Sequence, residues 1–185
     1  MARIKGVAMM NAVKALRAQK ERARELLPAR MHGYLDERIT VSRWYSEEDQ
    51  LELIRALARL LPDVVPTGAG DIYEYMGRFT ALRDMQGLYS HLLRPGDPEG
   101  TLRLGAATWK AYHDTGDFRV SFAEPGTAVL ELSGYGLPSS EMCRLLRGWY
   151  AQIIEMSGAK DVEMTKTHCR NQGDDRCAWK ATWTA

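Results

Sequence analysis

The sequence predicts an α+β fold, in which a helical layer packs on a four-stranded antiparallel sheet. Up to about residue 116, apolar residues recur at the three- and four-residue spacing of amphipathic helices. Beyond it, two pairs of segments alternate apolar and polar residues around glycine-containing turns, which is the pattern of β-hairpins. One amphipathic helix separates the hairpins. We therefore expect one sheet with helices covering one of its faces.

The first predicted helix spans about residues 5–24, because Met9, Val13 and Leu16 share one face. A short segment near residues 31–35 and extended chain over 39–45 follow. The next helix is expected to begin after Ser46 and to run to Pro62. Ser46 is a suitable N-cap, and the acidic residues that follow it suit the positive end of the helix dipole.

Two more helices are predicted before the sheet. One runs from Ile72 to Pro95, and the other begins at Asp97-Pro98 and ends at Gly116. The first hairpin then has strands over 118–122 and 128–132.

The rest of the sheet follows one helix. That helix spans about residues 139–157, between Ser139 and Gly158, and the last hairpin spans 163–183.

Composition limits the classes of function. With 185 residues we expect a single domain over 1–185. The 25 basic and 24 acidic side chains nearly cancel, so no overall field favours nucleic acid. No apolar run approaches the ~20 residues of a membrane span. Three cysteines form no disulfide framework, which fits a reducing compartment and a cytoplasmic protein.

The last hairpin carries the most informative motif. Cys169 and Cys177 flank Gly173, so an antiparallel pairing centred on that glycine places the two thiols opposite each other on one face. Cys143 lies on the preceding predicted helix. One site could therefore gather all three thiols.

This ending, from Cys169 to Trp183 with its Cys-x7-Cys spacing and Gly-Asp turn, resembles the 4-vinyl reductase domain family, which also supplies the sensory domains of aromatic-responsive activators. The segment 41–46 and the pair Trp109 and Tyr112 further resemble a myxobacterial paralogous family of similar length. The resemblance implies a fold shared with haem-based nitric-oxide sensors and with subunits of the TRAPP tethering complex. It also implies a pocket between helices and sheet for a small, largely apolar molecule.

The resemblance also implies a metal site. In the aromatic-sensing relatives, zinc is held by one helical cysteine, two hairpin cysteines and a carboxylate three residues before the first hairpin cysteine. Cys143, Cys169 and Cys177 match the three thiols, whereas Lys166 stands at the carboxylate position. Three states are left open: zinc, reduced and packed cysteines, and a disulfide between Cys169 and Cys177.

Haem is not expected. The nitric-oxide sensors of this fold hold the haem propionates with a Tyr-x-Ser-x-Arg motif, which this sequence lacks. The four histidines are not spaced as ligand pairs, and a lone histidine is usually a surface or hydrogen-bonded core residue. They are His32, His91, His113 and His168.

Large aromatic and methionine side chains on the helical segments are the candidates for binding the ligand. Each alone would suit an ordinary core, but together they supply the apolar surface and polar handles that a pocket needs. The residues are Trp44, Tyr45, Tyr73, Met76, Trp109, Tyr112, Met142 and Trp149. Replacing Ala107 or Gly148 by leucine is expected to fill such a pocket.

Three functional classes follow from these observations. The first is a non-catalytic module that binds a small hydrophobic or aromatic molecule and signals through a homodimer or a protein partner. The second is a TRAPP-like scaffold without a soluble ligand. The third, an enzyme, is not expected, because the sequence shows no nucleophile–base pair and no dinucleotide fingerprint.

Overall fold

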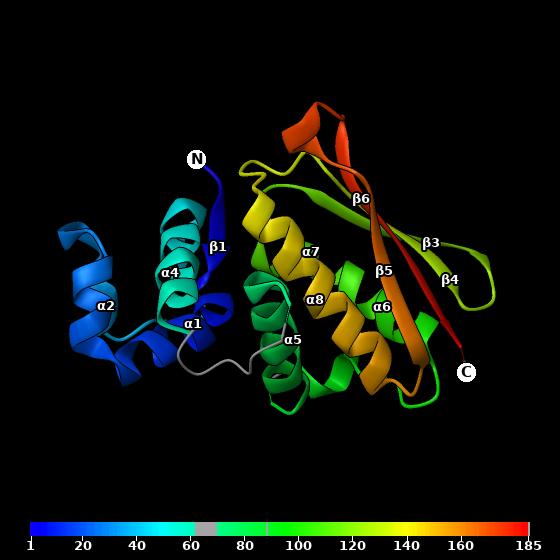
Figure 1. Cartoon of the computed structure of the whole chain (residues 1–185), viewed down its shortest axis with the longest axis horizontal. Helices are drawn as coiled ribbons and strands as arrows, with labels where there is room; N and C mark the ends of the chain where they lie inside the picture. The colour runs from blue at the N-terminus through cyan, green and yellow to red at the C-terminus, as the bar shows by residue number, and fades with distance from the viewer. Residues whose placement is uncertain (62–69, 88, 185) are drawn as a thin grey trace.

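A computed structural model describes residues 1–61, 70–87 and 89–184, and it confirms the α+β fold (Figure 1). Among these residues, the helices are α1 (Gly6–Ala18), α2 (Lys20–Leu26), α3 (Gly33–Asp36), α4 (Glu47–Leu60), α5 (Ile72–Met85), α6 (Pro98–Ala107), α7 (Trp109–Tyr112) and α8 (Ser140–Met156). The strands are β1 (Arg3–Lys5), β2 (Trp44–Ser46), β3 (Asp117–Glu124), β4 (Thr127–Ser133), β5 (Lys160–His168) and β6 (Arg176–Thr184).

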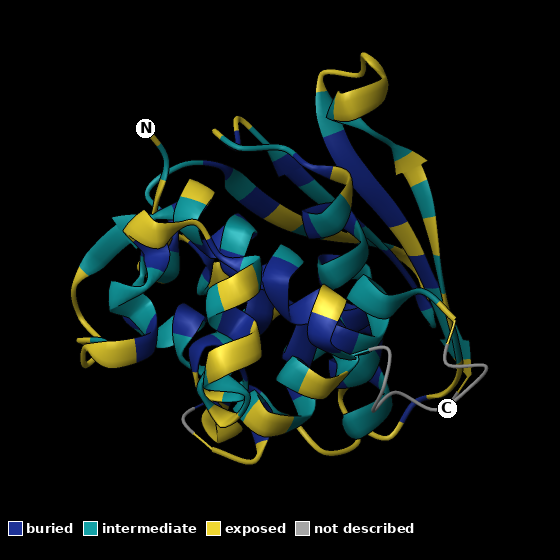
Figure 2. Ribbon diagram, turned by 60° about the vertical axis from the view of Figure 1, so that its left-hand side comes forward, coloured by how far each residue is buried: buried dark blue, intermediate teal, exposed yellow. Residues whose placement is uncertain are grey.

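The main sheet is antiparallel, with strand order β3-β4-β6-β5, so the two predicted hairpins lie side by side. Leu130 on β4 faces Trp179 on β6 across the central pair, and both side chains are buried. Central strands have neighbours on both sides, and the alternating pattern turns their apolar side chains toward the helices. Dark blue segments in Figure 2 mark the buried residues between the helices and the sheet.

Helices α5 and α8 cross at very close range because glycines occupy the crossing. A Cβ atom built on Gly77 would lie 2.1 Å from the carbonyl oxygen of Leu145, and one on Gly148 would lie 2.1 Å from that of Glu74. Real atoms do not approach so closely, so each helix needs its glycine here. The expectation that Gly148→Leu would fill a pocket is therefore wrong, because the leucine side chain would collide with the backbone of α5. Ala107, the other proposed position, is exposed.

Three predicted helices are interrupted or end early, at positions that their hydrophobic spacing did not predict. The chain leaves helical geometry at Gln19 (φ −129°, ψ 50°), which divides the predicted helix of residues 5–24 into α1 and α2. The helix that begins at Ile72 ends at Met85 rather than Pro95. Another break separates α6 from α7 at Thr108, whose hydroxyl donates to the carbonyl oxygen of Gly105.

The predicted capping of α4 is confirmed, since the Ser46 hydroxyl accepts the backbone N–H of Glu48. A small sheet was not predicted: β1 pairs with β2, and Ile4 also pairs with His113. This pairing fastens the N-terminus to the segment that follows α7.

In the described parts of the chain, the buried side chains form two hydrophobic clusters. The N-terminal cluster gathers buried side chains from α1, α2 and α4 and includes Met76 of α5. The sheet cluster gathers those of α5, α6, α8 and the four-stranded sheet. Figure 1 shows α5 and α8 standing between the N-terminal helices and the sheet. In the part of the chain that the structure describes, no helix is long and apolar enough to cross a membrane.

Candidate functional site: a cavity between the two hydrophobic clusters

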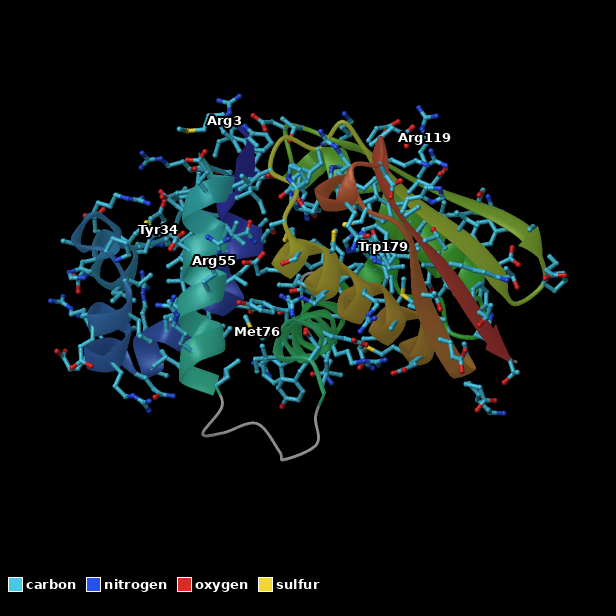
Figure 3. The ribbon with its side chains drawn as sticks, turned by 45° about the horizontal axis from the view of Figure 1, so that its top comes forward. Arg3, Tyr34, Arg55, Met76, Arg119 and Trp179 are labelled. Atoms are coloured by element: carbon cyan, nitrogen blue, oxygen red, sulfur yellow. The ribbon has the colours of Figure 1, made fainter. Side chains whose placement is uncertain are left out.

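A cavity of about 370 Å³ lies where the two clusters meet. Helices α1 and α4, with Ile4 of β1, form one wall. Helices α5, α6, α7 and α8 supply most of the rest, together with Tyr89 and Leu92 from the segment between α5 and α6. Small side chains on α1, namely Ala8, Ala12 and Ala15, leave the space open on its side. Met76 reaches from α5 toward α4 at this junction (Figure 3). The volume is within the range of small-molecule sites, roughly 300–1,000 Å³.

Aromatic side chains supply much of the lining. They are Tyr75, Phe79, Tyr89, Trp109, Tyr112, Trp149 and Tyr150. Phe79 is 52% exposed, so it is accessible from outside. Tyr89 and Tyr112 meet edge to face, with ring centroids 5.2 Å apart. Such rings present flat apolar surface with few rotatable bonds, which suits a pocket for a rigid or aromatic molecule.

One polar point of the lining is Asp84, in the last turn of α5. Its two carboxylate oxygens accept from the side-chain amide of Asn11 at 2.9 Å and the indole N–H of Trp149 at 3.1 Å. Burial raises the pKa of Asp84 to about 6, although both hydrogen bonds favour the ionised form. Asp84 therefore remains an anion at neutral pH, at a cost in free energy.

A second polar point lies where His113 follows α7. Its Nδ1 lies 2.6 Å from Oε1 of Glu47, whose side chain is only 1% exposed. The imidazole stacks on Trp109 at 3.8 Å, with the two planes 7° apart. The other carboxylate oxygen of Glu47 is buried as well, and the side chain of Tyr135 interacts with the same carboxylate. This geometry fixes the imidazole at the wall of the cavity.

Five of the eight predicted ligand-binding residues lie in the lining: Met76, Trp109, Tyr112, Met142 and Trp149.

The other three lie outside the lining. Trp44 lies beneath the Lys5 ammonium at 4.0 Å, and the Tyr45 hydroxyl accepts the backbone N–H of Thr40. Tyr73 lies beneath the guanidinium of Arg144 at 4.5 Å.

The three cysteines meet at a separate place, between α8 and the last hairpin. The sulfurs of Cys143, Cys169 and Cys177 lie within 4.8 Å of one another, and those of Cys143 and Cys177 are 3.6 Å apart. Gly173 makes the hairpin turn with a φ of 99°, a conformation that glycine adopts without strain. The geometry thus gathers the predicted thiols.

The ammonium group of a lysine side chain lies beside these thiols. The ammonium of Lys166 donates to the sulfur of Cys143 at 2.9 Å and lies 3.8 Å from the ring centre of Trp179. The hydrogen bond from Cys143 lowers the pKa of Cys177, with a further contribution from Lys166. The same hydrogen bond raises the pKa of Cys143. The two thiols therefore lose one proton readily and keep the other.

Sequence reasoning missed Asp84, Asn11, Glu47 and His113 as parts of a site. Asp84 gave no signal in the sequence, because its helix was expected to continue to Pro95; only the structure places it in a last turn, where the helix dipole disfavours an anion. The hydrogen bond between Glu47 and His113 could not be predicted from the sequence either, because 66 residues separate the two.

Comparisons with known proteins identify the fold. No protein-family model and no curated protein sequence matches this chain. Among solved structures, a mutant H-NOX protein from K. algicida in the Fe(II) unliganded state is similar, with a TM-score of 0.68, 14% identity, and 98% of this chain and 97% of that chain covered. An H-NOX protein from S. oneidensis in the Fe(II)NO state has a TM-score of 0.60, 16% identity, and 98% and 100% coverage. The predicted likeness to the nitric-oxide sensor fold is therefore confirmed.

The sequence-based exclusion of haem is wrong. The solved structures that share the fold are of haem-binding H-NOX proteins, one of them from Shewanella oneidensis in the Fe(II)CO state with a TM-score of 0.67, 15% identity, and 98% and 99% coverage. Zinc, one of the three states left open for the cysteines, has no support from these structures, whose metal is iron.

The lining of the cavity meets one requirement of a haem and lacks another. His113 is held through Nδ1 by a buried carboxylate, which is how many metal-binding imidazoles are oriented. Among the described residues of the lining, none is a lysine or arginine that could pair with propionates. Of the residues present, only the His113 imidazole suits a haem. The likeness to the H-NOX proteins is therefore a likeness of fold.

Proposed function

We propose that this protein is a non-catalytic sensory module whose cavity binds a small, largely apolar molecule. The observation that carries the proposal is the position of the cavity, which is lined by residues of both hydrophobic clusters. A ligand placed there contacts both clusters at once. Its binding energy can then favour one relative position of the clusters over another, which is the basis of a ligand-driven switch.

Further polar contacts, besides that of Glu47 with His113, cross the same boundary. Asn11 of α1 donates to Asp84 of α5, and Arg55 of α4 donates to Glu141 of α8 at 2.9 Å. Figure 3 shows Arg55 on α4, on the side of the molecule where the N-terminal helices face α8. A shift of α1 or α4 on ligand binding would lengthen or tighten these bonds. The signal would then leave through a second copy of the chain or a protein partner.

The alternative is a scaffold protein in which no soluble ligand occupies the cavity. The exposed aromatic ring of Phe79 favours this alternative to a degree, because exposed aromatic side chains are common at protein interfaces. The two functions differ in one measurable respect. Only the sensory module gains stability from a small molecule.

The test compares wild type with Ala12→Leu, which places a larger side chain into the cavity from α1. Melting temperatures are measured with a panel of small aromatic amines, alcohols and acids, and visible absorbance is measured after addition of hemin. At least one compound should raise the wild-type melting temperature and leave that of Ala12→Leu unchanged. Ala18→Leu is the matched control, because Ala18 is exposed on the same helix.

Failure of every compound and of hemin to shift the wild type would reject the sensory module. A scaffold would then be the better account. Equal shifts in wild type and Ala12→Leu would place the binding outside this cavity.

A further inference from the structure

The chemical class of the ligand follows from the charge of the cavity. We infer that the cavity binds a small aromatic or aliphatic amine, with the ammonium group against Asp84 and the apolar body among the aromatic rings. The inference rests on the proposed function, because it assumes that the cavity holds a ligand. It adds the sign of the ligand's charge and the residue that recognises it.

Among the residues that the structure describes, Asp84 has no cationic partner. No ion pair of Asp84 occurs among the described residues, and the part of the lining that the structure describes contains no lysine or arginine. The other acids that face neighbouring helices across α5 and α8 are paired: Glu74 binds Arg147, and Glu155 binds Arg78. A charge withdrawn from water is costly unless an opposite charge meets it.

The two hydrogen bonds to Asp84 orient it without neutralising it. Asn11 and Trp149 are neutral donors, one to each carboxylate oxygen. Each oxygen retains a further lone pair that can accept from a ligand. Placement in the last turn of α5 adds to the cost of the negative charge, because the carbonyl end of the helix also repels anions. A carboxylate that is costly, oriented and unpaired at a cavity wall is suited to bind a cation.

Aromatic rings complete the recognition of an ammonium group. Trp149, which donates to Asp84, lines the cavity with its ring, and the edge-to-face pair Tyr89 and Tyr112 lines it as well. The faces of aromatic rings attract cations, most strongly when water is excluded. The same rings pack on the apolar body of a ligand. Carboxylic acids would instead meet Asp84 as a like charge, so fatty acids and aromatic acids should be rejected.

The other titratable groups near this end do not pair with Asp84 as cations. Tyr89 has a pKa well above its usual range, because it is buried and lies close to Tyr112 and Asp84, so it stays neutral. His113 belongs to the second polar point, where the Glu47 carboxylate is its hydrogen-bond partner. The net charge offered to a ligand at Asp84 is therefore negative.

The test uses three probes of nearly equal shape: 2-phenylethylamine, the neutral 2-phenylethanol and the anionic 3-phenylpropionate. Titration calorimetry at neutral pH measures their affinities for wild type, Asp84→Asn and Asp84→Ala. We expect the wild type to bind the amine at least about tenfold more tightly than the alcohol, and the acid more weakly than both. In both variants the advantage of the amine over the alcohol should be lost. Asp175→Asn, in the exposed turn of the last hairpin, should behave as wild type.

Each result decides the inference. Equal affinity for amine and alcohol in wild type, or tighter binding of the acid, would overturn the amine assignment and leave the sensory module standing. Retention of the amine preference in both Asp84 variants would also overturn it. If none of the three probes binds while another compound of the wider panel does, the amine assignment fails alone. If nothing binds, both proposals fail. The comparison of amine with alcohol in wild type needs no variant, so it stands even if a substitution impairs folding.

Discussion

At the scale of single residues, Asp84 links the electrostatics of the cavity to stability. Burial raises its pKa from 3.8 to about 6, so the folded protein holds this proton more tightly than the unfolded chain does. By linkage, the contribution of Asp84 to folding is most favourable below about pH 4 and is lost as pH rises through about 6. For most carboxylates a fall in pH destabilises the folded protein, whereas for Asp84 a fall in pH stabilises it.

We predict that the free energy of unfolding of wild type, relative to that of Asp84→Asn, decreases between about pH 4 and pH 7. A shift of about two pKa units corresponds to at most about 3 kcal/mol, and partial contact with water reduces the expected change to about 2 kcal/mol. Urea unfolding at a series of pH values measures the difference. Parallel stability curves for the two proteins would show that Asp84 is well solvated.

The cysteines offer a second prediction at this scale. Cys169 is half-buried, whereas Cys143 and Cys177 are buried. In native protein, iodoacetamide should therefore modify Cys169 first, and the other two at least about tenfold more slowly, because they react only after local opening. Mass spectrometry of timed samples measures the order. Cys169→Ser is the control and should lose the fast adduct. Faster modification of Cys177 would mean that its lowered pKa outweighs its burial.

At this scale the sequence revealed the thiols and five of the lining residues, but not their polar partners. Cys143, Cys169 and Cys177 share a recognisable spacing, and Trp109 and Met76 lie on apolar helical faces. In contrast, the carboxylate that holds His113 belongs to a helix far away in the chain. Contacts of this kind depend on how helices pack, which no local pattern encodes.

At the scale of elements, the crossing of α5 and α8 is the most demanding contact. Gly77 and Gly148 let each helix touch the backbone of the other. The sequence predicted both helices from their apolar spacing, but their isolated glycines gave no indication of which partner they meet. Strand pairing was easier to predict, because alternation and short turns determine which segments become neighbours.

We predict that Gly77→Ala lowers the free energy of unfolding by more than about 3 kcal/mol. The added methyl would meet the carbonyl oxygen of Leu145 at 2.1 Å, so the helices must separate, and such overpacking is at the severe end of its range. Gly33→Ala in α3 is the matched control, since its Cβ meets only the flexible side chain of Glu37 at 3.4 Å. Urea unfolding of both variants measures the contrast. Equal stabilities would mean that the crossing can relax.

At the scale of the whole molecule, two hydrophobic clusters share one boundary, and the cavity lies on it. Asn11 and Asp84 join the clusters at the cavity, while Arg55 and Glu141 join them elsewhere along the boundary. Ligand binding should therefore order both sides together. The sequence predicted one domain, and the family resemblance implied a pocket between helices and sheet, whereas the cavity described above lies between two sets of helices.

We predict that a bound ligand slows amide hydrogen exchange in both α1 and α5, with little change in the outer strand β3. Both helices line the cavity, so local opening of either one would require loss of the ligand. Mass-spectrometric exchange with and without the tightest-binding compound tests this. Protection confined to α5 would indicate that the ligand does not couple the two clusters.

The central claim is that the cavity between α1 and α5 is a ligand site. Its most direct test is calorimetric titration of the best-binding compound into wild type and Ala12→Leu, with Ala18→Leu as the control. The account predicts saturable binding of one ligand per chain in wild type and Ala18→Leu, and loss of binding in Ala12→Leu while its far-ultraviolet spectrum stays that of wild type. Unchanged binding in a folded Ala12→Leu protein would contradict the claim.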